Sequence, residues 1–227
     1  RHGRAVDWLL DADADPNRGL RSGETPLMRC AHTGDPIAIR SLIGHGANID
    51  ATEPERGQTA LMRAAANQHP DVTQALLEAG ADVNVRTSTV QQLRGTGERS
   101  TTSPQGATYF NAGGFTALLF AARHGDIHSA RWLLEAGADV NDTGADGNSA
   151  LVLATMSGHE RLAQYLLERG ADPDASGAGY TALHAAVLRA QPDLITSLLD
   201  HRADVNVPLA KSTPVPRWTY QHIFVRR

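Results

Sequence analysis

The sequence repeats itself at an interval of about 33 residues, and this repetition restricts what the chain can fold into. The block Gly80-Ala81-Asp82-Val83-Asn84 recurs with small changes, and an apolar pair such as Leu76-Leu77 precedes each copy. The copies are residues 13–17, 46–50, 80–84, 137–141, 170–174 and 202–206. A period of this length is typical of solenoids, in which each unit buries its apolar face only against its neighbours.

A second landmark lies upstream of each apolar pair, where a hydroxyl residue precedes an apolar run. These residues are Thr25, Thr59, Thr116, Ser149 and Thr181, at intervals of 34, 57, 33 and 32 residues. Such a hydroxyl is typical of a helix N-cap, because its oxygen accepts an otherwise unpaired backbone N–H. We expect a short alanine-rich helix after it (for example 117–124), a turn, and a second helix that carries the leucine pair and ends at a glycine. An extended loop or hairpin, here called a finger, completes the unit.

These motifs resemble those of the ankyrin-repeat family, through Thr25-Pro26-Leu27 and its relatives and through the Leu-Leu…Gly-Ala-Asp-Val-Asn blocks. The resemblance implies an all-α repeat solenoid, an ankyrin array in one domain over residues 1–227. We place repeats at 18–50, 51–84, 85–141, 142–174 and 175–206, a partial unit at 1–17, and the start of a further finger without helices at 207–227. Three departures are that proline follows only the first threonine, that Arg202 replaces a helix-ending glycine, and that His184 alone keeps the family's histidine. Because both ends fall inside a repeat, we expect the natural protein to continue there or the chain to be a fragment.

Two segments depart from the repeat pattern. The insert 86–110 and the tail 207–227 both carry net positive charge, and they hold five of the eleven aromatic residues. Since each follows an Ala-Asp-Val-Asn block, we expect both to project from the finger edge. The insert could be a tolerated flexible loop, an extended binding finger, or a loop packed on the concave face. The tail could pack its aromatic residues against neighbouring fingers.

The sequence gives little support to catalysis, a cofactor or a metal site. A single cysteine excludes a disulfide within the chain and a cysteine-based zinc site, and Cys30 occupies a slot where other repeats have alanine. His124 and His128 are four residues apart, but Gly125-Asp126 should place a turn between them. We expect the Asp and Asn residues of the blocks to bond their own backbone rather than calcium. No apolar run approaches the ~20 residues that cross a bilayer.

The resemblance therefore implies a non-enzymatic protein-interaction scaffold without a cofactor, which binds an unidentified protein through finger tips and the exposed face of each first helix. Phe115 and Tyr180 are the expected aromatic anchors, because interface hot spots favour aromatic residues and arginine. The candidate residues are Arg21, Glu24, Arg56, Gln58, Tyr109, Phe110, Phe115, Arg123, His124, Asn148, Met156, Tyr180 and Trp218.

Two other functions stay open. The chain could be a structural or targeting arm of a larger bacterial protein, with no partner of its own in this segment. It could also bind an anionic ligand or nucleic acid through its basic loops, although the net charge of −4 argues against general nucleic-acid binding. We assume a monomer, and the sequence leaves both a cytoplasmic and an exported location open.

Overall fold

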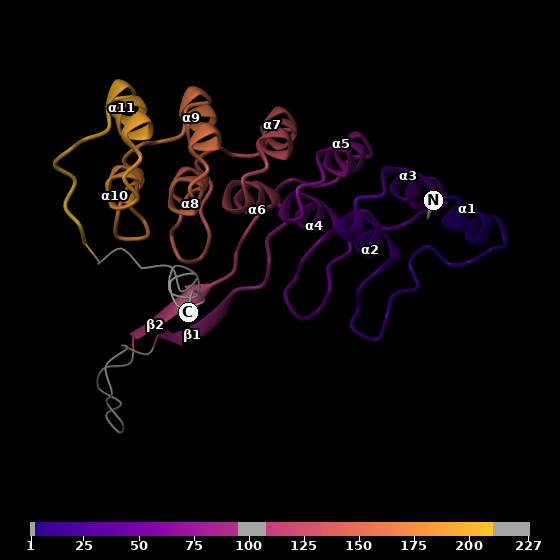
Figure 1. The fold of residues 1–227 in the computed structure, drawn as a ribbon. Coiled ribbons are helices and arrows are strands. Elements are labelled where there is room, and N and C mark those ends of the chain that lie inside the picture. The colour runs from indigo at the N-terminus through magenta and orange to yellow at the C-terminus, as the bar shows by residue number, and fades with distance from the viewer. Residues whose placement is uncertain (1–2, 95–107, 211–227) are drawn as a thin grey trace, which may run out of the picture.

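The computed structural model describes residues 3–94 and 108–210, and within these ranges the chain forms eleven helices and one small sheet. The helices lie in two rows (Figure 1). The inner row is α2 (Pro26–Thr33), α4 (Ala60–Ala66), α6 (Ala117–His124), α8 (Ala150–Ser157) and α10 (Ala182–Leu188). The outer row is α1 (Gly3–Asp11), α3 (Pro36–Gly44), α5 (Pro70–Glu78), α7 (Ile127–Glu135), α9 (Glu160–Glu168) and α11 (Pro192–Asp200). Each helix packs on the next in its row, and each inner helix packs on the outer helix that follows it, so the fold is the expected all-α repeat solenoid.

The hydroxyl residues begin the inner helices as the sequence predicts. Thr25, Thr59, Ser149 and Thr181 have extended backbones and accept the backbone N–H three residues ahead, for example from Met28 to Thr25 Oγ1 at 3.3 Å. Thr116 has the same backbone geometry at the start of α6 but makes no such side-chain bond. The N-cap pattern therefore fixes where each unit starts, even where the capping bond itself is missing.

The ends of the outer helices also follow the prediction. The glycine of the fourth block, Gly137, has a φ of +93°, which a residue with a side chain rarely adopts. Arg202 takes the same role in the last block with a φ of +66°. The backbone path of the repeat is therefore kept at Arg202 despite the strain of a side chain in the left-handed region.

The core lies between the two rows of helices. The first leucine of each pair is buried there: Leu42, Leu76, Leu133, Leu166 and Leu198 are at most 2% exposed. Leu9 occupies the equivalent position in α1, which has no inner helix of its own unit among the described residues, and Leu9 is 62% exposed. Burial of these leucines therefore depends on the inner helix of the same unit.

The repeated blocks form a ladder along the array. Within a block the third side chain accepts the backbone N–H of the fifth residue, as from Asn84 to Asp82 Oδ1 at 2.8 Å. Between blocks the fifth side chain accepts the N–H of the next block, as from Asp172 to Asn141 Oδ1 at 2.8 Å. These oxygens bond backbone groups, which confirms their structural role.

The insert contains an antiparallel hairpin formed by β1 (Val90–Arg94) and β2 (Thr108–Ala112). Val90 pairs with Ala112 and Arg94 with Thr108. The hairpin lengthens the third finger and projects beyond its neighbours (Figure 1). Among the three possibilities for the insert, its described part takes the form of an extended finger.

The helices in the described ranges are seven to nine residues long, and none of them is long and apolar enough to span a membrane.

Candidate interaction surface

A groove of about 660 Å³ lies at the base of the hairpin, on the side of the inner helices. Three fingers and one helix supply its walls. The lining residues are Glu55, Arg56 and Gln58 from the second finger, Thr87, Ser88, Val90, Ala112, Gly113 and Phe115 from the third, Asp146 from the fourth, and Phe120 and Arg123 from α6. Four of the predicted partner-binding residues are therefore brought together: Arg56, Gln58, Phe115 and Arg123.

Backbone hydrogen bonds between fingers hold the walls of this groove. The N–H of Ser88 donates to the carbonyl of Arg56 at 2.8 Å and joins the third finger to the second. The N–H of Ala145 donates to the carbonyl of Gly113 at 3.0 Å and joins the fourth finger to the third. Because main-chain groups make these two bonds, the bonds do not depend on which side chains the finger tips carry.

Two phenylalanines form the apolar floor of the groove. Phe115 and Phe120 meet edge to face, with ring centroids 5.7 Å apart and an interplanar angle of 79°. Phe115 is only 9% exposed because the fourth finger covers it, and a Cβ added at Gly144 would lie 2.4 Å from Phe115 Cε1. Phe115, an expected aromatic anchor, therefore lies largely buried at the groove. Phe120, which sequence reasoning missed, is half-buried in the same groove.

Two arginines line the groove, and a third, Arg86, lies in the same finger as part of its wall. Arg86 is engaged: its Nη1 donates to the carbonyls of Gly114 and Thr143, both at 3.0 Å, and its Nη2 pairs with Asp142. Arg56 and Arg123 are exposed at the groove. The first arginine fastens the third finger to the fourth, whereas the other two present charge to the groove.

A buried carboxylate shapes the second finger. Glu53 is 5% exposed and accepts the backbone N–H groups of Glu55, Arg56 and Gln58 at 2.8, 2.9 and 3.2 Å. Burial alone would raise the pKa of Glu53, but these hydrogen bonds and the charge of Arg63 outweigh it, so the pKa is lowered. Sequence reasoning missed Glu53, because a glutamate before a proline in a loop carries no specific signal.

The surface continues from the groove towards the first finger. Arg56 and Gln58 also line a smaller hollow of about 190 Å³, together with Glu24. Glu24 forms an ion pair there, with its Oε1 2.6 Å from Arg63 Nη1. Arg63 belongs to α4, so this pair joins the second inner helix to the first finger. Arg21 is exposed on the first finger outside these hollows.

The predicted residues of the fourth and fifth fingers form packing contacts. Tyr180 is 2% exposed, and its hydroxyl donates to Asn148 Oδ1 at 2.9 Å. Met156 in α8 is also buried. Tyr180, an expected aromatic anchor, is therefore buried, and its hydroxyl joins the fifth finger to the fourth.

The remaining predicted residues lie elsewhere. His124 is the last residue of α6, and its backbone carbonyl accepts a hydrogen bond from the side-chain amide N–H of Gln68. Burial lowers the pKa of the His124 ring, and the nearby charges of Arg123 and His159 lower it further. Tyr109 and Phe110 belong to β2. Trp218 lies outside the described residues.

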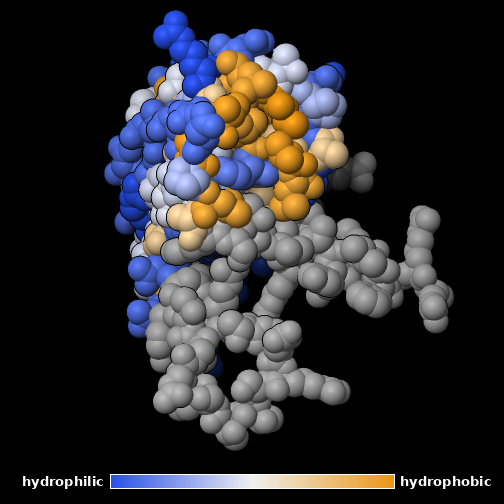
Figure 2. All heavy atoms as spheres, turned by 90° about the vertical axis from the view of Figure 1, so that its left-hand side faces the viewer, coloured by the Kyte–Doolittle hydropathy of each residue, from blue (hydrophilic) through white to orange (hydrophobic). Residues whose placement is uncertain are grey.

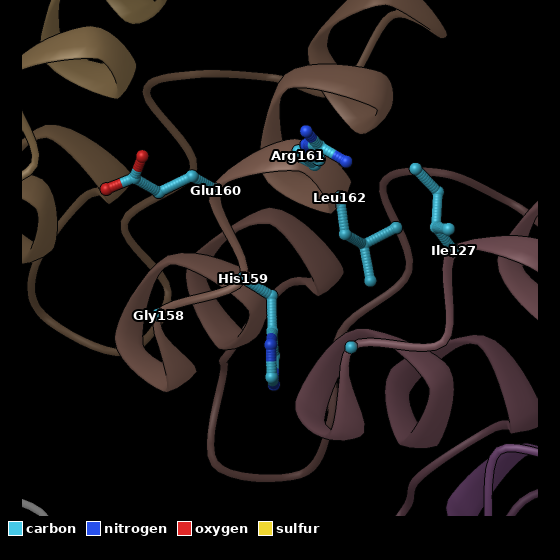
Figure 3. Close-up of a pocket in the computed structure, with 7 residues that line it drawn as sticks. Ile127, Gly158, His159, Glu160, Arg161 and Leu162 are labelled. Atoms are coloured by element: carbon cyan, nitrogen blue, oxygen red, sulfur yellow. The ribbon is translucent and has the colours of Figure 1, made fainter.

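A second hollow of about 370 Å³ lies near the start of α9 (Figure 3). It lies where His159 packs against the preceding repeat. The ring of His159 lies over Gly125 of the preceding repeat, with its Nε2 3.2 Å from the carbonyl oxygen of Arg123. His69 makes the same contact two repeats earlier, with its Nε2 3.1 Å from the carbonyl oxygen of His32. Over residues 3–94 and 108–210, no group of three or more histidine, cysteine or acidic side chains is placed to hold a metal ion.

Comparison with known proteins identifies the repeats. A family model described as ankyrin repeats in three copies matches residues 1–87 and 118–208. The unmatched stretch between these ranges contains the hairpin. A search of curated proteins found no match.

Proposed function

Since the chain belongs to the ankyrin-repeat family, whose members generally mediate protein–protein interaction, we propose that it is a non-enzymatic scaffold whose partner binds at the groove beside the hairpin. The proposal extends to the neighbouring finger tips and to the concave face of the inner helices. It assigns the central contacts to Arg56, Gln58 and Arg123, with Phe120 beneath them.

The observation that supports this proposal is the convergence in one groove of two exposed arginines, Arg56 and Arg123, with the half-buried ring of Phe120. Arginine and aromatic side chains carry much of the energy in protein interfaces, especially where the partner excludes water. Glu55 and Asp146 line the same groove and give it mixed charge. We therefore expect a partner that presents carboxylates to the arginines together with at least one apolar group.

The groove by itself is too small for a stable interface. A standard complex buries ~1,600 Å² in total, or ~800 Å² on each partner. The hairpin on one side and the first finger on the other extend the surface beyond the groove. A partner seated in the groove can therefore reach both without a change in the array.

A pair of charge reversals tests the proposal. Arg123→Glu changes the groove, whereas Arg40→Glu changes an exposed arginine on α3 in the outer row. Both variants and the intact chain serve as baits in lysate of the source cells. We expect a protein that is captured by the intact chain and by Arg40→Glu and is lost with Arg123→Glu.

The other outcomes distinguish the alternatives. Equal capture by all three baits would move the binding site away from the groove. Absence of any partner would favour a structural or targeting arm. Binding of an anionic polymer that weakens steeply with salt would favour the basic loops, because phosphate binding releases counterions.

A further inference from the structure

The hairpin leaves one main-chain edge of each of its strands open. β1 and β2 pair with each other over consecutive residues without a bulge, in a sheet of two strands. Among residues 3–94 and 108–210, no main-chain hydrogen bond joins either strand to a segment outside this pair. An open strand edge presents a row of N–H and C=O groups that can pair with another strand.

A different kind of exposed surface ends the array at α10 and α11. The apolar side chains of Val187 and Leu188 are 61% and 53% exposed there, and Figure 2 shows hydrophobic residues gathered on that end. Apolar side chains do not fix the conformation of whatever covers them. The hairpin edge does, because only an extended chain matches the spacing of its main-chain groups.

The hairpin lacks the features with which proteins usually protect strand edges. Prolines, lysines and bulges hinder the pairing of an edge strand with another chain. Residues 90–94 and 108–112 contain no proline and no lysine, and Arg94 is their only charged residue. The two strands also pack chiefly on each other rather than on a helix. Because a two-stranded hairpin is only marginally stable by itself, a third strand would stabilise it as well as occupy its edge.

The open edge of β1 begins at the groove. Ser88 donates its N–H to the carbonyl of Arg56, so the second finger lies along the chain that leads into β1. The approach is close, since a Cβ added at Gly57 would lie 2.9 Å from the backbone nitrogen of Ser88. The second finger makes no main-chain bond beyond this point. Val90, the first residue of β1, is 47% exposed and lines the groove.

We propose that an extended, acidic segment of a partner protein adds to the open edge of β1 as a third strand and places a carboxylate against Arg56 and Arg123. This pairing rests on the proposed function, because it describes how the partner at the groove binds. Both arginines are exposed, and neither forms an ion pair with a carboxylate of the described residues. Asp146, an acidic residue of the groove, is already bonded to the backbone N–H and side-chain amide of Asn148. The charge of the groove therefore favours an acidic segment.

The length of the edge favours a different protein over a second copy of the chain. Five residues of strand span about 17 Å, which is too short by itself for the ~1,600 Å² of a standard interface. Two hairpins that paired edge to edge would meet beyond the neighbouring fingers, where the hairpin projects (Figure 1). A partner segment that continues from the edge into the groove instead adds contacts with Arg56, Arg123 and Phe120.

Selected peptides test the pairing in the full chain. A library of random dodecapeptides displayed on phage is selected against the immobilised chain, and one bound peptide is synthesised. Two further versions of this peptide carry N-methyl groups on alternate residues, one version in each of the two possible frames. Because an added strand donates only every second N–H to its neighbour, one frame should weaken binding by about tenfold or more. The other frame should leave it nearly unchanged.

Amide hydrogen exchange measured by NMR locates the bound peptide. The N–H groups of residues 90–94 that face away from β2 should exchange quickly in the free chain and slowly in the complex, because hydrogen bonding protects them. Exchange in residues 108–112 should not change. Arg123→Glu should weaken binding of the unmodified peptide by about tenfold. The matched variant Arg40→Glu, on α3 of the outer row, should bind it as the intact chain does.

Several results would overturn the proposal. The selection could yield no peptide that binds the full chain, the two N-methylated forms could bind with equal affinity, or the protection could appear in residues 108–112 instead. Light scattering could also show a dimer in which residues 90–94 are already protected, which would identify a second copy as the occupant.

The two kinds of variant separate this proposal from the proposed function. Binding that is lost with Arg123→Glu but is insensitive to N-methylation would refute the added strand and leave the groove as the binding site. Binding that is sensitive to one N-methylated frame but unaffected by Arg123→Glu would place the strand outside the groove and contradict both.

Discussion

Leu133→Ala should destabilise the array strongly, because Leu133 is fully buried between α7 and the inner row. The substitution removes three carbon groups, and at about 0.8 kcal/mol for each the lost transfer free energy is about 2.4 kcal/mol. The cavity that remains adds to this, so the total loss in the free energy of unfolding should be about 2–5 kcal/mol.

Leu9→Ala is the matched control for Leu133→Ala. Leu9 stands at the equivalent position of α1 but is 62% exposed, so the same change should cost less than about 1 kcal/mol. Urea titration followed by circular dichroism at 222 nm measures both, with the slope m checked for constancy. Equal losses from the two variants, or an unchanged midpoint for Leu133→Ala, would refute the assignment of these leucines to the core.

Three further perturbations test other parts of the structure. Gly125→Ala should lower the melting temperature more than Gly137→Ala. Both glycines have positive φ, but a Cβ at Gly125 would lie 2.4 Å from His159 Nδ1, whereas a Cβ at Gly137 would have no atom within 4 Å. Equal shifts in melting temperature would contradict the packing of His159 against Gly125. Glu53→Gln should reduce the free energy of unfolding by about 1–3 kcal/mol at neutral pH. Since the folded-state pKa of Glu53 is lowered, its stabilisation is present above the unfolded pKa and is lost as pH falls through the folded one, so urea titrations at decreasing pH should show the two proteins converging. Deleting residues 90–112 should leave the ellipticity at 222 nm nearly unchanged, because the inner and outer helices contact one another without the hairpin; a collapse would show that the hairpin belongs to the core.

The sequence predicts the array well because its signals are local. A hydroxyl N-cap such as Ser149, a leucine such as Leu166 and a glycine such as Gly137 each act within one unit, and the structure gives each of them the expected role. The spacing of these signals sets the order of the units. The same spacing located the insert, since the interval between Thr59 and Thr116 is too long for one repeat.

The surface was harder to predict because neighbouring units determine it. Phe115 and Tyr180 are next to finger tips in sequence, but Gly144 lets the fourth finger cover one ring and Asn148 binds the hydroxyl of the other. The role of Glu53 depends on the path of its own loop rather than on a motif. Exposure at a finger tip is thus a property of two adjacent repeats and cannot be inferred from one of them.

Site-specific photo-crosslinking tests the interaction surface most directly. A benzophenone amino acid replaces Gln58, which lines the groove, or Arg40, which lies on the outer row, and the full chain is irradiated in lysate of the source cells. A partner bound at the groove should give a discrete crosslinked band from position 58 and none from position 40, and Arg123→Glu should abolish that band. A band from position 40 alone, or one from position 58 that persists with Arg123→Glu, would contradict binding at this groove.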